Sequence, residues 1–137
     1  MFAHLELTID ELLLDENNPR LGAAGSQSEA LEMLVNMNQS NFRNMMISIR
    51  NNSLDPGDSL YVIEADDDED YVVLEGNRRL AALMVLVNPD VLDSTNVSIT
   101  TKKSLERAAS GFDRKAVEPI RCVLFPGREA AHDWIYR

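Results

Sequence analysis

The 137-residue sequence contains one cysteine, Cys122, and no apolar run long enough to cross a bilayer. A single cysteine excludes an internal disulfide and any metal site built from several cysteines. A membrane-spanning helix needs roughly 20 consecutive apolar residues, and the first residues also lack the basic and long apolar stretches of a secretory signal. We therefore expect a cytoplasmic domain with no membrane partner.

Positive charge is scarce, since 13 Lys and Arg residues stand against 23 Asp and Glu residues and give a formal net charge of −10. Non-specific binding of duplex DNA needs a basic face, so we do not expect this segment to bind it alone. Much of the acidic excess lies in one cluster between Glu64 and Asp70. The cluster lacks the spaced ligands and mid-loop glycine of an EF-hand, which predicts the solvated tip of a hairpin rather than a calcium site.

Histidine is also rare, and this bears on metal binding. His4 and His132 lie far apart, and the sequence has no His-Glu-x-x-His pattern, so no zinc site is predicted. Cys122 lies inside the expected strand 120–125, where no basic side chain in a fixed register argues for a thiolate, and we expect it in the core rather than as a reactive thiol. Apart from Glu75, discussed below, the sequence therefore predicts no metal ligand.

The hydrophobic pattern predicts a single α+β domain over residues 1–137. Apolar residues make up 45% of the chain, as in a globular protein with one core. We expect β-type segments at 5–14, 60–63, 71–74 and 120–125, the first of them with a turn of helix at 8–12. We expect helices that begin near residue 26 and that cover 42–49, 77–87, 102–109 and 128–137. The runs 60–63 and 71–74 are expected to form a hairpin, and 91–101 a loop. The last helix has no stop signal, which suggests the N-terminal part of a longer protein.

The most informative segment joins an apolar, β-branched run to Gly76, followed by Arg78, Arg79 and an apolar helical series. We expect a strand to end at Gly76 and a helix to begin at once. The open N–H groups of the first helical turn, the positive end of the helix dipole and two guanidinium groups would then face the same small volume. This arrangement predicts an anion site, and the forked donors of arginine favour phosphate as its occupant.

Other roles for these residues remain open. Arg78 and Arg79 could form salt bridges instead, for example with Glu75 or Asp15, although arginines at a helix start oppose the dipole and so favour a bound anion. Asn77 could be the N-cap of the helix, a phosphate contact or both. Glu75 could hold a magnesium ion, orient an arginine or end the strand in solvent.

Two segments together resemble the amino-terminal domain of the ParB/sulfiredoxin superfamily. The first, 14–20, contains the turn Asn18-Pro19-Arg20, and the second, 75–82, contains the Gly-x-Arg-Arg junction. Two helices and a hairpin expected between them also match the order of elements in that family. The resemblance covers most of residues 5–137 and is weakest over 91–118. It implies a small mixed β-sheet flanked by helices, with a nucleotide pocket at the Gly76 junction.

The resemblance also implies a function. In that family the junction binds nucleotide phosphates, and in ParB proteins the nucleotide is CTP with Mg²⁺, whose binding and hydrolysis switch a DNA-sliding clamp. Carried over to this chain, Gly76, Arg78 and Arg79 would contact the phosphates, while Pro19 and Arg20 would shape the other wall. The implied function is a nucleoside-triphosphate-binding regulatory switch that forms a homodimer and contacts DNA through regions beyond residue 137.

The sequence departs from the family pattern at two positions of the junction. ParB has a glutamate where this chain has Asn77 and a later arginine where it has Ala81. Sulfiredoxin has its cysteine at the position of Asn77, so sulfiredoxin activity is not expected. ParB's second phosphate motif, Asn-x-x-Arg, would fall near or beyond residue 137.

Two other functions remain open from the sequence. One is a ParB-like nuclease, with the arginines on a DNA phosphate and Glu75 on a metal. The other is a non-catalytic interaction domain with a degenerate pocket. No residue is identified as a base for hydrolysis.

Overall fold

The computed structural model describes residues 3–19, 21–67 and 69–136, so Arg20, one of the expected site residues, lies outside the described part. The strands are β1 (Ala3–Leu7), β2 (Leu12–Leu13), β3 (Leu60–Glu64), β4 (Tyr71–Glu75) and β5 (Ile120–Leu124). The α-helices are α1 (Gln27–Met37), α2 (Gln39–Asn52), α3 (Asn77–Val87), α4 (Ile99–Ala109) and α5 (Arg128–Ile135). Three 3₁₀ helices, η1 (Ile9–Glu11), η2 (Pro89–Ser94) and η3 (Arg114–Ala116), connect them.

The strands form a mixed sheet in the order β1-β5-β3-β4-β2. The pairs β1–β5 and β3–β4 are antiparallel, whereas β3–β5 and β2–β4 are parallel. β5 enters between the first strand and the hairpin, so that Cys122 is paired with Leu5 on one side and with Leu60 on the other. The fold is therefore of the expected α+β class, with a five-stranded mixed sheet flanked by helices.

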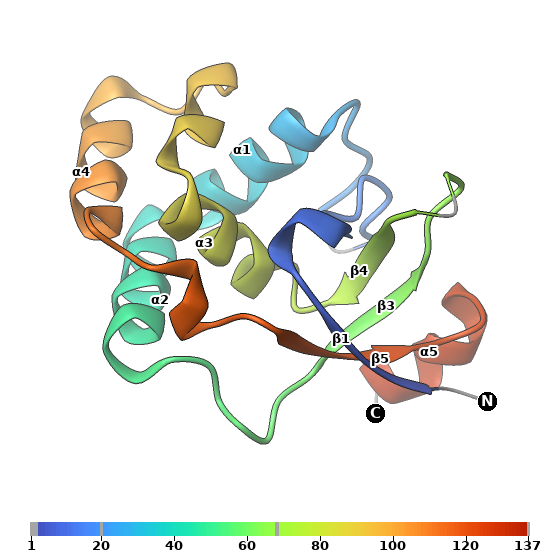
Figure 1. Ribbon diagram of the computed structural model, residues 1–137. Coiled ribbons are helices and arrows are strands. Elements are labelled where there is room, and N and C mark those ends of the chain that lie inside the picture. The colour runs from blue at the N-terminus through green and yellow to red at the C-terminus, as the bar shows by residue number, and fades with distance from the viewer. Residues whose placement is uncertain (1–2, 20, 68, 137) are drawn as a thin grey trace.

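The two faces of the sheet have different partners, because successive side chains of a strand point to opposite sides. One face places Leu60 and Cys122 in the main core with the helices α1 to α4. The opposite face packs Tyr61 and Val123 with Ala131 of α5 in a smaller cluster. In Figure 1, α1 to α4 accordingly lie together, and α5 lies apart from them beyond the strands.

α3 is enclosed by the rest of the domain. Seven of its eleven residues are buried, and it contacts α1, α2 and α4 as well as the end of β4. The prediction of a central, buried helix over 77–87 is confirmed with the same bounds. The first turn of α3 follows the end of β4 directly. Side chains on this turn are therefore held in place by the packed core of the domain.

Most other predicted elements are also confirmed, including the β3–β4 hairpin, the short helical turn inside 5–14 and the buried strand around Cys122. The prediction of a loop over 91–101 is wrong. Pro89–Ser94 forms η2, and α4 already begins at Ile99. The Asn88 and Ser98 side chains accept hydrogen bonds from the N–H groups of Asp90 and Thr101, so these polar residues act as helix caps.

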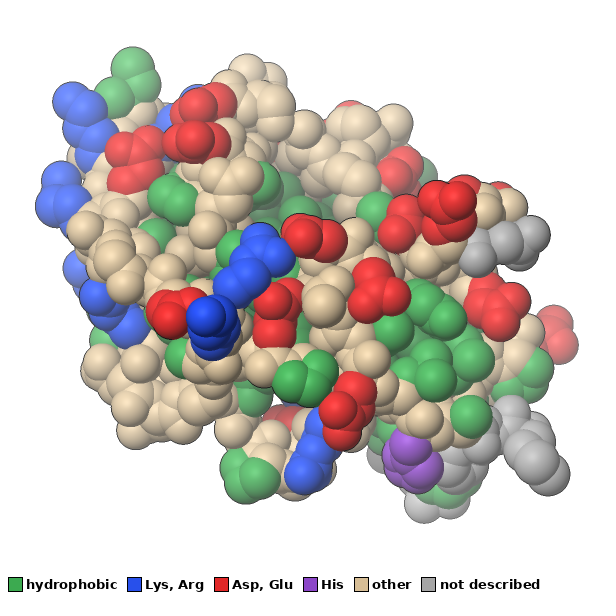
Figure 2. Space-filling view, viewed as in Figure 1, with side chains coloured by type: hydrophobic (Ala, Val, Ile, Leu, Met, Phe, Trp, Pro, Cys, Tyr) green, Lys and Arg blue, Asp and Glu red, His purple; other side chains and the backbone are tan. Residues whose placement is uncertain are grey.

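The acidic cluster lies at the tip of the β3–β4 hairpin, where Glu64, Asp66, Asp67 and Glu69 are exposed. This confirms the prediction of a solvated tip; Asp68 lies outside the described residues. The Asp67 carboxylate accepts hydrogen bonds from the N–H groups of Asp70 and Glu69, and these lower its pKa. Figure 2 shows acidic side chains over this hairpin and Lys and Arg side chains along the edge formed by α4. Of the helices described, none is long and apolar enough to cross a membrane.

Candidate phosphate site at the start of α3

A single residue, Gly76, joins β4 to α3. Its φ angle is 100°, in the left-handed region that side chains disfavour. A Cβ atom at this position would lie 2.3 Å from Cδ2 of Leu60 and 3.0 Å from Nη2 of Arg79. Both the backbone angle and the close approach therefore require glycine. The prediction that the strand ends here and the helix begins at once is confirmed.

The first turn of α3 has open backbone donors. Helical hydrogen bonding begins with the N–H of Leu80, which donates to the carbonyl of Gly76 at 2.9 Å. The N–H groups of Asn77, Arg78 and Arg79 precede this bond, and none of them donates to another group of the described residues. Gly76 is the N-cap and has no side chain to satisfy them. Three donors and the positive end of the helix dipole are thus available to an anion.

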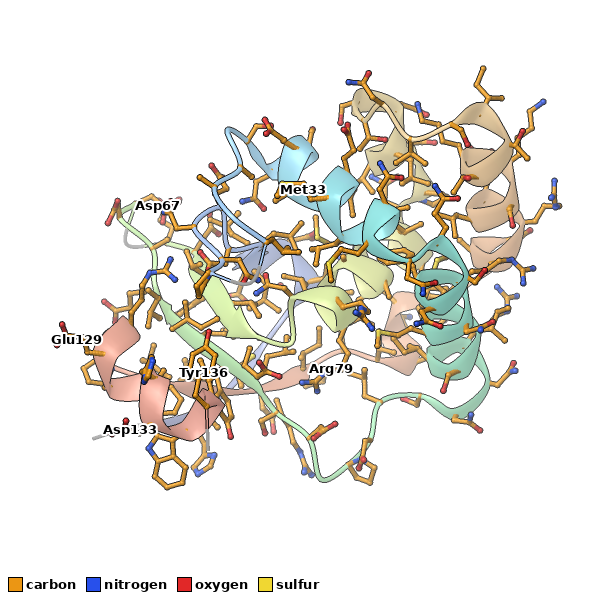
Figure 3. The ribbon with its side chains drawn as sticks, turned by 180° about the vertical axis from the view of Figure 1, so that it is seen from behind. Met33, Asp67, Arg79, Glu129, Asp133 and Tyr136 are labelled. Atoms are coloured by element: carbon orange, nitrogen blue, oxygen red, sulfur yellow. The ribbon has the colours of Figure 1, made fainter. Side chains whose placement is uncertain are left out.

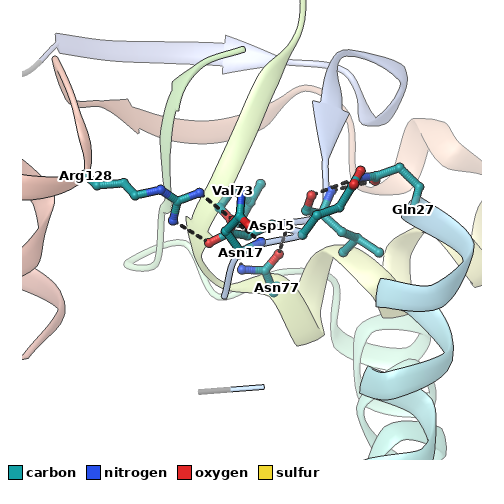
Figure 4. A network of polar contacts seen from close by, with 8 residues as sticks. Asp15, Asn17, Gln27, Val73, Asn77 and Arg128 are labelled. Atoms are coloured by element: carbon teal, nitrogen blue, oxygen red, sulfur yellow. Dashed lines mark hydrogen bonds and ion pairs between the residues drawn. The ribbon is translucent and has the colours of Figure 1, made fainter. Parts of the chain in front are cut away.

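Asn77 has a structural role that the sequence did not reveal. The residue is buried, its Oδ1 accepts from the N–H of Asp15 at 2.9 Å, and its Nδ2 donates to the carbonyl of Val73 at 2.9 Å (Figure 4). Of the roles left open for Asn77, the N-cap is not the one observed, because Gly76 holds that position and the Asn77 amide connects β4 to the loop after β2. Only the backbone N–H of Asn77 remains for a phosphate.

The two arginines differ in their surroundings. Nη1 of Arg79 lies 3.5 Å from Oδ2 of Asp58, so this guanidinium is partly neutralised by the loop before β3. Arg78 is half-buried, and within the described part of the chain it has no carboxylate at salt-bridge distance. Within the described residues, neither arginine forms the salt bridge with Glu75 or Asp15 that the sequence left open, and Asp15 pairs with Arg128 instead. Arg78 is therefore the cation best placed to bind an external anion.

A hollow of about 310 Å³, here called the α5 hollow, opens between this junction and α5. Figure 3 shows Arg79 at the junction and Tyr136 on the α5 side of it. The α5 hollow is lined by the predicted site residues Asn18, Glu75, Gly76, Asn77, Arg78 and Arg79, and by Leu21, Leu34, Met37, Met45, Leu74, Ile135 and Tyr136. Pro19 is exposed and is not among the lining residues, although the turn predicted around it is present, with the Asn18 carbonyl accepting from Leu21 and Gly22.

A second depression of about 430 Å³, here called the α2 groove, begins at the same two arginines and follows α2. Its lining consists of Asn41, Asn44, Met45, Ser48, Ile49, Ser53, Leu54, Asp55, Asp58, Arg78 and Arg79. Arg78, Arg79 and Met45 line both depressions. The sequence gives no sign of the α2 groove, because the polar residues on α2 fit an ordinary amphipathic helix.

An ion pair that the sequence did not indicate supports the wall of the site. Both carboxylate oxygens of Asp15 bind the guanidinium of Arg128, at 2.6 and 2.8 Å. The hydrogen bonds to Asp15 raise the pKa of Arg128. Since the N–H of Asp15 also donates to Asn77, the loop after β2, α3 and α5 form one polar network.

The remaining chemically active groups of the chain lie elsewhere. Cys122 is buried, and this burial raises the pKa of its thiol to about 12, which confirms the prediction of a core cysteine. No three His, Cys, Asp or Glu side chains of the described residues form a group that could hold a metal ion.

Compared with protein-family models, curated proteins and solved structures, the chain gave no significant match. Its resemblance to the ParB/sulfiredoxin superfamily therefore stays a prediction from the sequence. The geometry of the site has to be interpreted from its own residues.

Proposed function

We propose that this domain binds a nucleotide and that the nucleotide's phosphates lie against the first turn of α3. The observation that carries the proposal is Arg78, a cation without a carboxylate partner among the described residues. It lies beside three open backbone N–H groups on the wall of a hollow. Anions bind at helix starts because unpaired N–H groups and the helix dipole both favour negative charge.

Phosphate suits this site better than a carboxylate for two reasons. Arginine presents its donors in a planar fork that matches two phosphate oxygens, and Arg78 and Arg79 stand on adjacent positions of one helical turn. Gly76 is the N-cap and has no side-chain oxygen to accept from the first-turn N–H groups, so these donors stay open to a tetrahedral group. A diphosphate or triphosphate would use both guanidinium groups and the N–H groups together.

The apolar residues that line the α5 hollow suit the base of a nucleotide. Met37 and Tyr136 are exposed among them, and Leu34 and Leu74 add apolar surface. Ligand pockets are usually about 300–1,000 Å³, so a hollow of about 310 Å³ would enclose one part of a nucleotide and leave the rest at the surface.

The proposal agrees with the resemblance to ParB-like domains, in which the nucleotide is a triphosphate with Mg²⁺ and the domain is a regulatory switch for a DNA-associated protein. Mg²⁺ commonly takes one or two carboxylates together with phosphate oxygens and water. Glu75 lines the hollow beside the proposed phosphate position and is the carboxylate placed to serve in this way. Catalysis, if the nucleotide is hydrolysed, would rest on charge stabilisation by Arg78 and Arg79.

Isothermal titration calorimetry with each nucleoside diphosphate and triphosphate, with and without Mg²⁺, tests the proposal. We expect Arg78→Ala to weaken binding by about 10- to 100-fold, which corresponds to about 1.5–3 kcal/mol for a hydrogen bond to a charged group. Arg107→Ala is the matched control, since Arg107 is an exposed arginine on α4 outside both depressions. Equal affinities of the wild type and Arg78→Ala would contradict the proposed site.

A further inference from the structure

We propose that the ligand is a nucleoside diphosphate joined to a sugar, with the base in the α5 hollow, the diphosphate at the start of α3 and the sugar in the α2 groove. This inference rests on the proposed function and specifies the ligand class of the same site. It comes from the position of the two arginines between the two depressions.

The arrangement of the two depressions indicates a ligand with an organic group at each end. Arg78 and Arg79 line both the α5 hollow and the α2 groove, so a phosphate bound by them would lie next to both depressions. A nucleoside triphosphate carries an organic group at one end only and would leave one depression without a ligand. A sugar ester of a nucleoside diphosphate has a base at one end, a sugar at the other and its charge in the middle.

The side chains of the α2 groove suit a sugar. Asn41, Asn44 and Ser48 follow one another at helical spacing along α2 and are exposed. Within the described residues the side chains of Asn44 and Ser48 form no hydrogen bond, so their amide and hydroxyl groups are available. Amides and hydroxyls both donate and accept, which is what a ring of sugar hydroxyl groups requires. Ile49 adds an apolar contact for the C–H groups of the ring.

Two carboxylates in the α2 groove argue against a third phosphate there. Asp55 and Asp58 both line the groove, and Asp58 is also the ion-pair partner of Arg79. A phosphate beyond the two arginines would meet these like charges, which repel it. A sugar hydroxyl would instead donate to them, since an ionised carboxylate has about four acceptor positions and Asp55 uses one for the N–H of Gly57. The groove is therefore complementary to a neutral, hydroxyl-rich group.

Calorimetry on matched ligand pairs tests the inference. ADP, CDP, GDP and UDP are each compared with their glucose esters, and ADP also with ADP-ribose. We expect at least one sugar ester to bind about tenfold more tightly than its parent diphosphate, the equivalent of one or two net hydrogen bonds. Asn44→Ala should remove this gain and leave the affinity for the parent diphosphate unchanged. Asn51→Ala, an exposed amide on the same helix outside the groove, is the control.

The possible failures can be distinguished. If no sugar ester binds more tightly than its diphosphate, or if Asn44→Ala weakens both equally, the inference is overturned. The proposed function still stands in that case if diphosphate binding is lost in Arg78→Ala. If neither diphosphates nor sugar esters bind, both proposals fail together. A nucleoside triphosphate that shifts the Asn44 side-chain amide signal in NMR as a sugar ester does would also overturn the inference.

Discussion

The carboxylate of Asp15 and the guanidinium of Arg128 form a two-pronged ion pair between residues that are 113 positions apart in the sequence. Asp15 is 4% exposed. The side chain of Arg128, the first residue of α5, is 42% exposed. The same Asp15 donates its backbone N–H to Asn77 at the start of α3. One buried acidic residue thus links α5 to the helix that carries the candidate site.

We expect Arg128→Ala to lower the free energy of unfolding by about 1–3 kcal/mol. Removing one partner of a buried pair leaves the other charge uncompensated, which costs about 3–5 kcal/mol when both are buried. The cost is smaller here because Arg128 is partly exposed to solvent. Urea unfolding followed by circular dichroism measures the change.

Arg114→Ala is the matched control for that experiment. Arg114 forms a single-pronged ion pair with Asp10 at 2.9 Å and lies 3.8 Å from Glu118, but its own side chain is 39% exposed and that of Asp10 is 74% exposed. Exposed pairs contribute about 0–1 kcal/mol. Equal losses in the two variants would show that the burial of Asp15 does not strengthen its pair with Arg128.

Asn77→Ala should lower the free energy of unfolding by about 1–3 kcal/mol. The substitution leaves the N–H of Asp15 and the carbonyl of Val73 without their partner in a buried position, and unsatisfied buried groups cost this much. Asn51→Ala, at an exposed position of α2, should change stability by less than about 0.5 kcal/mol. Thermal or urea unfolding of the two variants provides the comparison, and a neutral Asn77→Ala would argue against the network.

Gly76→Ala should destabilise the domain more than Gly22→Ala. Both glycines have positive φ angles, 100° and 88°, so both substitutions impose a backbone cost of about 1–2 kcal/mol. The new methyl group at position 76 would also collide with the buried Leu60, whereas position 22 has no atom within 4 Å. Overpacking of this kind adds about 1–3 kcal/mol. Urea unfolding gives the loss of unfolding free energy in each variant, and the difference between the two losses measures the cost of the collision with Leu60.

The Cys122 thiol should be inert in the folded protein. Burial raises its pKa from 9.0 to about 12, so at pH 8 a disulfide reagent should label it only after unfolding in urea. A group whose pKa is raised in the folded state contributes stability that is complete below pH 9 and is lost as the pH rises toward 12. Above pH 9 the wild type should therefore lose up to about 1.4 kcal/mol per pH unit more than Cys122→Ala. Parallel slopes would contradict the burial of the thiol.

Local sequence patterns predicted the part of the site that is continuous in the chain. The β-branched run, Gly76 and the apolar series after Arg79 set strand, junction and helix within seventeen residues; the helix has the expected bounds, and the strand ends one residue later than expected, at Glu75. The spacing of apolar residues and the position of the glycine determine secondary structure through contacts between neighbours in the sequence. The strand and the helix can therefore be predicted without knowledge of the fold.

Other parts of the site depend on contacts between distant residues. Nothing near Asp15 indicates Arg128, and nothing near Arg79 indicates Asp58, because these partners meet only after the sheet and helices have packed. Asparagine is a common helix cap, but Asn77 is buried against β4, and its side-chain amide joins β4 to the loop after β2. The helical segments within 91–101 were missed for a different reason. This stretch is rich in Ser, Thr and Asn, which are common in loops, but serine is also a common helix cap, and Ser98 is one here.

The position of β5 inside the sheet affects the order in which the strands can pair during synthesis. β1 pairs with β5 in the described structure, so β1 leaves the ribosome before residues 120–124, with which it pairs, have been made. The hairpin and α1 to α4 can associate earlier, since they precede β5 in the chain. Non-local strand pairing of this kind slows folding. Nascent chains that stop before Ile120 therefore lack a complete sheet and leave one edge of β3 open.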